Sequence, residues 1–235
     1  MNGKLAFVAT TGLIGAVAFL TLGIGLSGRD WIDARHLWGA MPSTCQSTAS
    51  TRQQVTLPFT PNDSLTIQLP ASVRYQPGDK AEAIVSGDPG LLDHVQIEGN
   101  RLSLDCDPGW SASRLDVSIS GPAITDWKLL GSGDLTLSQI SQPELRLSIR
   151  GSGSVAATGA TDTVDLDISG SGAARLRGLT SKSAQITIRG SGDAQMTARG
   201  DADVSIFGSG NVELSGHPTV KRSEIRGSGR IVQTP

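Results

Sequence analysis

The chain has 235 residues, with 20 Lys+Arg against 22 Asp+Glu and a formal net charge of −2. This near-neutral balance, without a polybasic arm, argues against nucleic acid as a partner. Glycine is abundant, with 29 residues, whereas the aromatic residues are few (Phe 4, Trp 4, Tyr 1). The core must therefore consist of small and aliphatic side chains, which suits thin, stacked β layers. With 3 histidines and 2 cysteines in the whole chain, a His–Cys metal cluster is not expected, and the sequence predicts no cofactor.

The chain begins with a long apolar segment. Residues 5–26 form a run of 22 residues without a charged side chain. A membrane-spanning helix needs about 20 such residues, whereas the apolar region of a signal peptide has about 7–15. The length therefore favours a retained membrane anchor within residues 1–28, with a cleaved signal segment as the alternative. In both cases the polar linker over 29–54 and everything after it are expected on the exported side.

Export would give the two cysteines a role. Cys45 lies in the polar linker, and Cys106 ends the strand-like segment LSLDC. In an oxidising compartment two thiols often pair, and the bond would close a loop of about 60 residues and add roughly 3–4 kcal/mol of stability. Two free thiols are the alternative, and the sequence does not choose between them.

The second half of the chain carries an internal repeat. The tripeptide Gly-Ser-Gly occurs six times, at successive spacings of 20, 19, 20, 18 and 19 residues. A fixed period near 20 residues is typical of a solenoid. A sharp corner needs positive φ or a close approach of two backbones, and glycine allows both at low cost. We therefore predict structural corners at Gly131, Gly133, Gly151, Gly153, Gly170, Gly172, Gly190, Gly192, Gly208, Gly210, Gly227 and Gly229.

Aliphatic side chains recur at fixed distances from each corner. Parallel columns lie two, four and six positions before the first glycine, and four and six positions after it. The column two positions before consists of Leu129, Ile149, Ile168, Ile188, Ile206 and Ile225. Alternation with a period of two on both sides of a glycine predicts strand, turn and strand. The sequence therefore predicts an all-β fold, a parallel β-helix of about six regular units over residues 126–234, with the aliphatic columns as its core.

Residues 55–125 are also rich in strand patterns, but they lack this period. Segments such as SLTIQLP, AEAIVSG and RLDVSIS alternate between apolar and polar residues, and turn signals separate them. The segment 88–93 (DPGLLD) fits a single helical turn. We expect residues 55–125 to cover the first turn of the β-helix, so that its apolar end is not left open.

The last repeat differs from the others. Ser223 and Lys221 stand in two columns that are aliphatic in earlier repeats, and Gln233 interrupts a third. Positive charge collects in the same repeat, from Lys221, Arg222, Arg226 and Arg230. Two such ends would bring like charges together, so the sequence predicts a solenoid that is not a filament former.

A set of carboxylates raises the question of an enzyme. Parallel β-helices include polysaccharide lyases and hydrolases, and Asp165, Asp167 and Asp203 fall on one predicted face, where they would suit a glycosidase-like pair. Aspartates that simply face solvent are the alternative. Because the repeats are almost uniform in length, whereas an active site needs a pocket, the solvent-facing explanation is favoured.

A row of arginines is the candidate binding surface. Arg150, Arg189 and Arg226 stand directly before the corner on alternate repeats. Such a row suits an anionic glycan or lipid. Solubility and protection of the sheet against edge pairing would explain the same residues.

The Gly-Ser-Gly repeats, preceded by the segment AEAIVSGDPGLLDHVQIEGNRLSLDC, resemble the bacterial head GIN domain family over residues 55–234. The family is labelled an auto-transporter adhesin and is otherwise a domain of unknown function. The resemblance implies a right-handed β-helix at the bacterial cell envelope, and it supplies no catalytic residues. We therefore predict a non-catalytic envelope protein, not an enzyme, which adheres, scaffolds or binds a surface through a glycan or protein partner. Residues 5–26 would hold it to the membrane, with the C-terminal domain periplasmic or extracellular. A polysaccharide-active lyase or hydrolase is the alternative.

Overall fold

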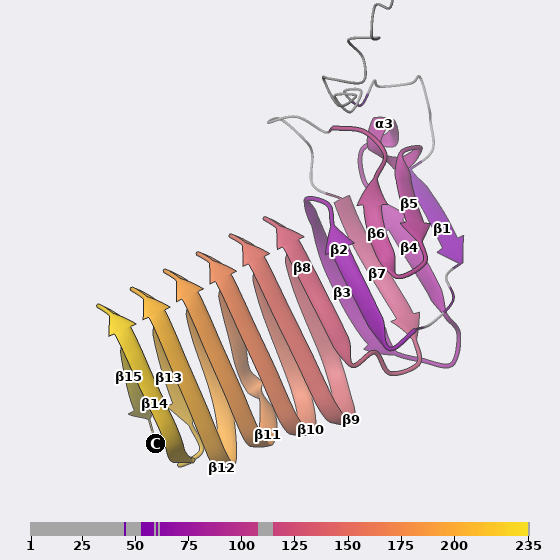
Figure 1. Ribbon diagram of the computed structural model, residues 1–235. Helices are drawn as coiled ribbons and strands as arrows, with labels where there is room; N and C mark the ends of the chain where they lie inside the picture. The colour runs from indigo at the N-terminus through magenta and orange to yellow at the C-terminus, as the bar shows by residue number, and fades with distance from the viewer. Residues whose placement is uncertain (1–44, 46–52, 59, 61, 108–114, 235) are drawn as a thin grey trace, which may run out of the picture. The chain divides into compact units, whose positions relative to one another are not determined.

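The computed structural model describes residues 45, 53–58, 60, 62–107 and 115–234 (Figure 1). The predicted anchor or signal segment 1–28, and the linker 29–54 apart from residues 45, 53 and 54, lie outside these residues. The described residues all belong to one compact unit, Ser43–Pro235. Within the described part, no helix combines the length and the apolar character that crossing a membrane requires.

Four long strands form the body of a β-helix. They are β9 (Asp134–Gly151), β10 (Ser154–Gly170), β11 (Ala173–Gly190) and β12 (Asp193–Gly208), which lie parallel and side by side in Figure 1. Each strand bends once, so its first residues belong to one face of the coil and its last residues to the other. We call these faces sheet 1, which follows each Gly-Ser-Gly corner, and sheet 2, which precedes it. The six corners bound about five turns, one fewer than the number of units predicted.

The register stacks the predicted columns on one another. In sheet 2 Ile168 lies opposite Ile149 and Ile188, and in sheet 1 Val155 lies opposite Leu135 and Ala174. All six side chains are at most 1% exposed. The all-β solenoid predicted from the period is confirmed, and aliphatic side chains fill the space between its two sheets.

Glycine is required at the corners for two separate reasons. Gly190 has φ of +128°, and a Cβ there would lie 2.3 Å from the carbonyl oxygen of Gly170 one turn away. A Cβ on Gly192 would lie 2.6 Å from the Cγ2 of Ile168 in the core. The corners also bond to one another, since the Ser191 amide donates to the Gly170 carbonyl at 2.9 Å. At the corners, the backbone of each turn therefore lies in direct contact with the backbone of the preceding turn.

The solenoid begins earlier in the chain than the repeat indicates. Strands β2 (Ser64–Gln68) and β3 (Ala71–Pro77) make a further turn, parallel to β8 (Asp126–Gly131) and to the start of β9. Its corner is Leu69-Pro70-Ala71, and it places Ile67 beside Leu129 of the repeat. Because this corner is not Gly-Ser-Gly, the period could not reveal it.

Residues farther out close the N-terminal end of the coil. Strand β6 (Arg101–Leu104) adds to β2, and β7 (Leu115–Gly121) adds to β3, both in parallel. Antiparallel strands then end both sheets, with β4 (Glu82–Ser86) and β1 (Gln54–Pro58) on sheet 1 and β5 (Val95–Glu98) on sheet 2. The helical turn predicted at 88–93 is confirmed as α3 (Pro89–Leu92), whose N-cap Asp88 accepts a hydrogen bond from the Gly90 amide at 2.9 Å. We call residues 78–107 the cap.

The C-terminal end is more open. Strand β13 (Asn211–Ser215) continues sheet 1, β14 (Thr219–Gly227) continues sheet 2, and β15 (Arg230–Thr234) ends sheet 1. The prediction that Lys221 occupies a core column is wrong. A register shift places Val220 opposite Ala202, and the Lys221 ammonium points outward to donate to Asp201 at 2.6 Å. Ser223 does occupy its predicted column, opposite Val204.

Candidate functional site

The arginine row lies on the outer surface of sheet 2, but two of its three members are engaged. Arg189 pairs with Asp167, and Arg226 pairs with Glu224 at 2.8 Å while its guanidinium lies 5.5 Å from the ring centre of Phe207. Arg150 is exposed and forms no ion pair with any described residue. Most of the row's positive charge is thus balanced by neighbouring carboxylates.

The three aspartates share this surface without forming a pocket. Gln185 lies between Asp165 and Asp203 in the register, so these two carboxylates are two strand spacings, or about 10 Å, apart. Burial raises the pKa of Asp165, with Arg146 opposing the shift and Asp167 adding to it. Three grooves lie elsewhere, one at the bends of β9 to β12, one beside β13 and one beside β3, and none of these aspartates lines them. The arrangement is that of a flat polar strip.

A groove of about 600 Å³ lies where the long strands bend, on the side of the coil away from the glycine corners. Neighbouring segments of β9, β10, β11 and β12 line it in turn, so it runs along the axis of the solenoid. Its polar lining includes Ser141, Gln142, Thr161, Asp162, Lys182 and Arg199. Lys182 pairs with Asp162 at 2.7 Å, whereas Arg199 is exposed and forms no ion pair with any described residue. The Gln142 Nε2 already donates to the carbonyl oxygens of Ile124 and Glu144. The groove therefore offers hydroxyl groups and the Gln142 Oε1 together with one unbalanced cation.

Unequal bends hollow the surface at this point. The register shifts at the bends of β10, β11 and β12, while it holds at every corner. Between the last core residue of sheet 1 and the first of sheet 2, β11 has seven residues (Arg177–Ser183) but β12 has five (Thr197–Asp201). This groove was not predicted from the sequence, although the uneven repeat spacings of 20, 19, 20 and 18 residues reflect the unequal bends.

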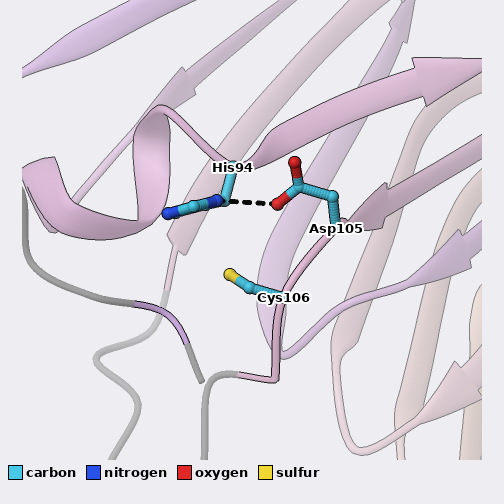
Figure 2. A group of neighbouring side chains, drawn as sticks. All are labelled: His94, Asp105 and Cys106. Carbon is cyan, nitrogen blue, oxygen red and sulfur yellow. Dashed lines mark hydrogen bonds and ion pairs between the residues drawn. The ribbon is translucent and has the colours of Figure 1, made fainter. Parts of the chain in front are cut away.

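A second group of chemically active side chains lies in the cap. Figure 2 shows His94, Asp105 and Cys106, whose potential ligand atoms all lie within 4.8 Å of one another. His94 Nδ1 lies 2.7 Å from Asp105 Oδ1. The antiparallel pairing of β5 with β6 creates this contact, because Val95 opposite Leu104 brings the preceding His94 beside Asp105. The turn signal at Gly99-Asn100, read as a hairpin, would have predicted it.

Cys106 is bonded to Cys45 in a disulfide with a Cα–Cα distance of 5.1 Å, so the structure has the paired form of the two cysteines. A disulfide sulfur is not a thiolate and does not serve as the ligand that zinc prefers. In this form the cluster offers one imidazole and one carboxylate, which is fewer than the three protein ligands of a typical zinc site. The oxidised cluster therefore does not fit a zinc ion.

Comparison with known proteins identifies a matching family and solved structures with a similar fold. The model of the family described as "Putative auto-transporter adhesin, head GIN domain" matches residues 62–218. A crystal structure of a putative adhesin from Bacteroides fragilis is 18% identical and has a TM-score of 0.61, covering 79% of this chain and 98% of that one. A putative lipid binding protein from Parabacteroides distasonis (17% identity, TM-score 0.49) and a putative adhesin from Parabacteroides merdae (15%, 0.46) also match, each over 79% of this chain and 98% of its own. No curated protein matches.

The family match covers the cap, the first turns and the first five Gly-Ser-Gly repeats, and the Bacteroides fragilis structure shares the β-solenoid. Both agree with the resemblance seen in the sequence. The chain belongs to the head GIN domain family.

Proposed function

We propose that this protein is a non-catalytic binding protein of the bacterial cell envelope, and that its β-helix holds an anionic glycan in the groove at the strand bends. The observation that carries the proposal is the groove itself, which follows the solenoid axis across four consecutive strands. A linear polymer can lie along such a groove and meet the same kinds of group on each turn. Adhesion or scaffolding would follow from this binding.

The chemistry of the lining supports a charged carbohydrate. The Ser141 hydroxyl and the Gln142 Oε1 are suited to sugar hydroxyls, whereas the Gln142 Nε2 already donates to the carbonyl oxygens of Ile124 and Glu144. Arg199 has no carboxylate partner among the described residues, so its guanidinium is available to a carboxylate or sulfate on the glycan. Lys182 would contribute if its ammonium released the Asp162 carboxylate and paired with an anionic group of the glycan.

The arginine row is the competing surface. Arg189 and Arg226 already contact carboxylates, so an anionic ligand would have to displace those partners. The row also lies outside the three grooves, and binding sites are usually concave. We therefore favour the groove over the row of Arg150, Arg189 and Arg226.

Titration of the full chain in detergent with polygalacturonate, a polyanionic glycan, tests the proposal. Dextran serves as the neutral probe. We expect binding of polygalacturonate that weakens with added salt, and an affinity at least about tenfold lower in the Arg199→Ala variant, since a charge-assisted hydrogen bond contributes about 1.5–3 kcal/mol.

Arg150→Ala is the matched control, because it removes an exposed arginine from the row. Its affinity should equal that of the wild type. Loss of binding in Arg150→Ala with no change in Arg199→Ala would move the site to the row. Absence of binding to polygalacturonate would reject the anionic-glycan proposal.

The position in the envelope is part of this proposal. Membership of an adhesin-like family supports a cell-surface or envelope protein. We propose further that residues 5–26 anchor the chain in the membrane, that the β-helix is exported to the periplasm or the cell exterior, and that its coil is right-handed. Carbonate washing of membranes tests the anchor, because a cleaved signal segment would release a shortened soluble protein.

We propose no catalytic role for Asp165, Asp167 and Asp203. Their flat surroundings on sheet 2 support this, since a glycosidase must enclose the scissile bond between two carboxyl groups. A glycosidase would require a cleft around these aspartates on the outer surface of sheet 2.

A further inference from the structure

The cluster of His94, Asp105 and Cys106 is not used by the proposed function. It lies in the cap (Figure 2), whereas the groove lies on the bends of β9 to β12. The Cys106 side chain is nearly buried, with the residue 6% exposed, while the side chains of His94 and Asp105 are 27% and 50% exposed. The site therefore has a buried sulfur and a route to solvent.

Hydrogen bonds of the main chain hold the contributing segments together independently of the disulfide. The Cys45 amide donates to the Asp107 carbonyl at 3.0 Å, and the Asp105 amide donates to the His94 carbonyl at 3.1 Å. The His94 amide donates to Leu91 of helix α3 at 3.0 Å. Because none of these bonds involves sulfur, the four side chains should stay close when the disulfide is opened.

Reduction would change the chemistry of this cluster. A dithiol reductant transfers two electrons and two protons to the Cys45–Cys106 bond, and it leaves as a disulfide while two thiols form. The site would then offer two thiols, one imidazole and one carboxylate, a set of four ligands. Zinc binds such nitrogen, oxygen and sulfur ligands tetrahedrally, and thiol deprotonation releases two protons to solvent.

The dimensions also fit. Two sulfurs on one tetrahedral zinc ion lie about 3.8 Å apart. Rotation about the side-chain bonds provides this separation when the Cα atoms are 5.1 Å apart. The remaining ligand atoms, on His94 and Asp105, already lie within 4.8 Å of Cys106 Sγ.

We propose that the reduced protein binds one zinc ion through Cys45, Cys106, His94 and Asp105, so that Cys45 of the linker is joined to the cap either by a disulfide or by zinc. The two links exclude each other, because both use the same sulfur atoms. The cluster thus exchanges a covalent link for a metal link when its thiols are reduced.

Metal analysis of the full chain in detergent tests this directly. Protein is reduced, freed of the reductant without air, given excess zinc sulfate and desalted, and zinc per chain is measured by mass spectrometry. We expect one zinc per reduced chain and none per oxidised chain. With cobalt(II) in place of zinc, the reduced protein should show a thiolate-to-cobalt charge-transfer band and the intense visible bands of a tetrahedral site.

Variants separate this site from adventitious binding. His94→Ala and Asp105→Asn should each lower the zinc affinity of the reduced chain at least tenfold, and Cys106→Ser should abolish the charge-transfer band from that sulfur. His217→Ala is the matched control, because His217 is exposed and lies in the last repeats, and its affinity should not change. Circular dichroism checks that each variant keeps its β structure.

Three results would overturn the proposal. Reduced protein that retains no zinc would do so, as would equal zinc binding by the oxidised form. An unchanged affinity in both His94→Ala and Cys106→Ser would place any bound zinc elsewhere.

Discussion

Two constraints can act on the first glycine of a corner, namely a positive φ and close contact with the preceding turn, and the sequence does not show which of them applies. Gly131 and Gly190 both have positive φ, +99° and +128°. A Cβ on Gly190 would lie 2.3 Å from the Gly170 carbonyl oxygen, whereas a Cβ on Gly131 would have no heavy atom within 4 Å. Substitution of the first glycine of the tripeptide should therefore lower the unfolding free energy by different amounts at different turns.

This difference gives a paired prediction. Gly131→Ala should cost about 1–2 kcal/mol of unfolding free energy, the price of a left-handed backbone alone. Gly190→Ala should cost about 3–5 kcal/mol, because neighbouring backbones must also move apart. Urea denaturation measures both. Equal losses would show that close stacking does not determine the need for glycine.

Asp165 gives a prediction about pH. Burial raises its pKa above the ordinary value, so the folded state holds the proton at a pH where the unfolded chain has released it. Stability from this group is therefore present at low pH and is lost as pH rises from the ordinary value through the raised one. Asp165→Asn removes that loss. The variant should gain stability relative to the wild type between pH 3 and pH 7 in urea titrations. A variant that loses stability relative to the wild type over this range would contradict the raised pKa.

Some residue-level features were beyond sequence reasoning. Lys221 fits the core column by counting, and only the shifted register shows that Val220 takes its place. The pairing of Cys45 with Cys106 could not be predicted either, because it depends on whether the fold brings two cysteines 61 positions apart in the sequence together. Counting along the chain assumes a uniform strand, and a bulge breaks that assumption.

At the scale of the strand, alternation between the core and the solvent controls stability. Ile168 is fully buried between Ile149 and Ile188, while the next residue, Ser169, lies between Arg150 and Arg189 on the outer surface. The two positions are adjacent in sequence but lie in opposite environments.

Aspartate at these two positions should therefore have opposite outcomes. Ile168→Asp buries an unpaired charge and should cost more than about 4 kcal/mol, enough to unfold a marginally stable domain. Ser169→Asp adds a carboxylate beside two arginines and should change stability by less than about 0.5 kcal/mol. Thermal unfolding of the two variants provides the comparison. A wild-type melting temperature for Ile168→Asp would mean that the core column is misassigned.

The sequence predicted elements well where they repeat and less well elsewhere. Strands β9 to β15 follow from one period and one corner, because each turn must bury the same columns. The turn of β2 and β3 was missed, since Leu69-Pro70-Ala71 makes its corner with other residues. The groove depends on the number of residues in each bend. The conserved spacing of the core columns around each corner does not determine that number. Each unpredicted feature lies where the chain departs from its repeat.

For the whole molecule, the two ends of the coil determine assembly. Antiparallel strands and α3 end the cap side, where Leu91 and Leu92 are buried. The other end is more exposed than the sequence indicated, since Ile225 and Val232 are each 42% exposed. Arg222 nevertheless stays at that edge, so two such ends would still repel each other.

We therefore predict that the purified protein does not form filaments at neutral pH and physiological salt. Negative-stain electron microscopy should show separate particles. Rods that lengthen with protein concentration would show that Ile225 and Val232 drive end-to-end stacking in spite of the charge.

The most direct test of the central claim, binding without catalysis at the bend groove, is the chain length of a glycan recovered from its complex. Polygalacturonate is incubated with the protein, captured with it and analysed by mass spectrometry. Our account predicts that the wild type retains the glycan at its original length and that Arg199→Ala fails to retain it. Shortened products that disappear in the Asp165→Asn variant would contradict the account and identify an enzyme.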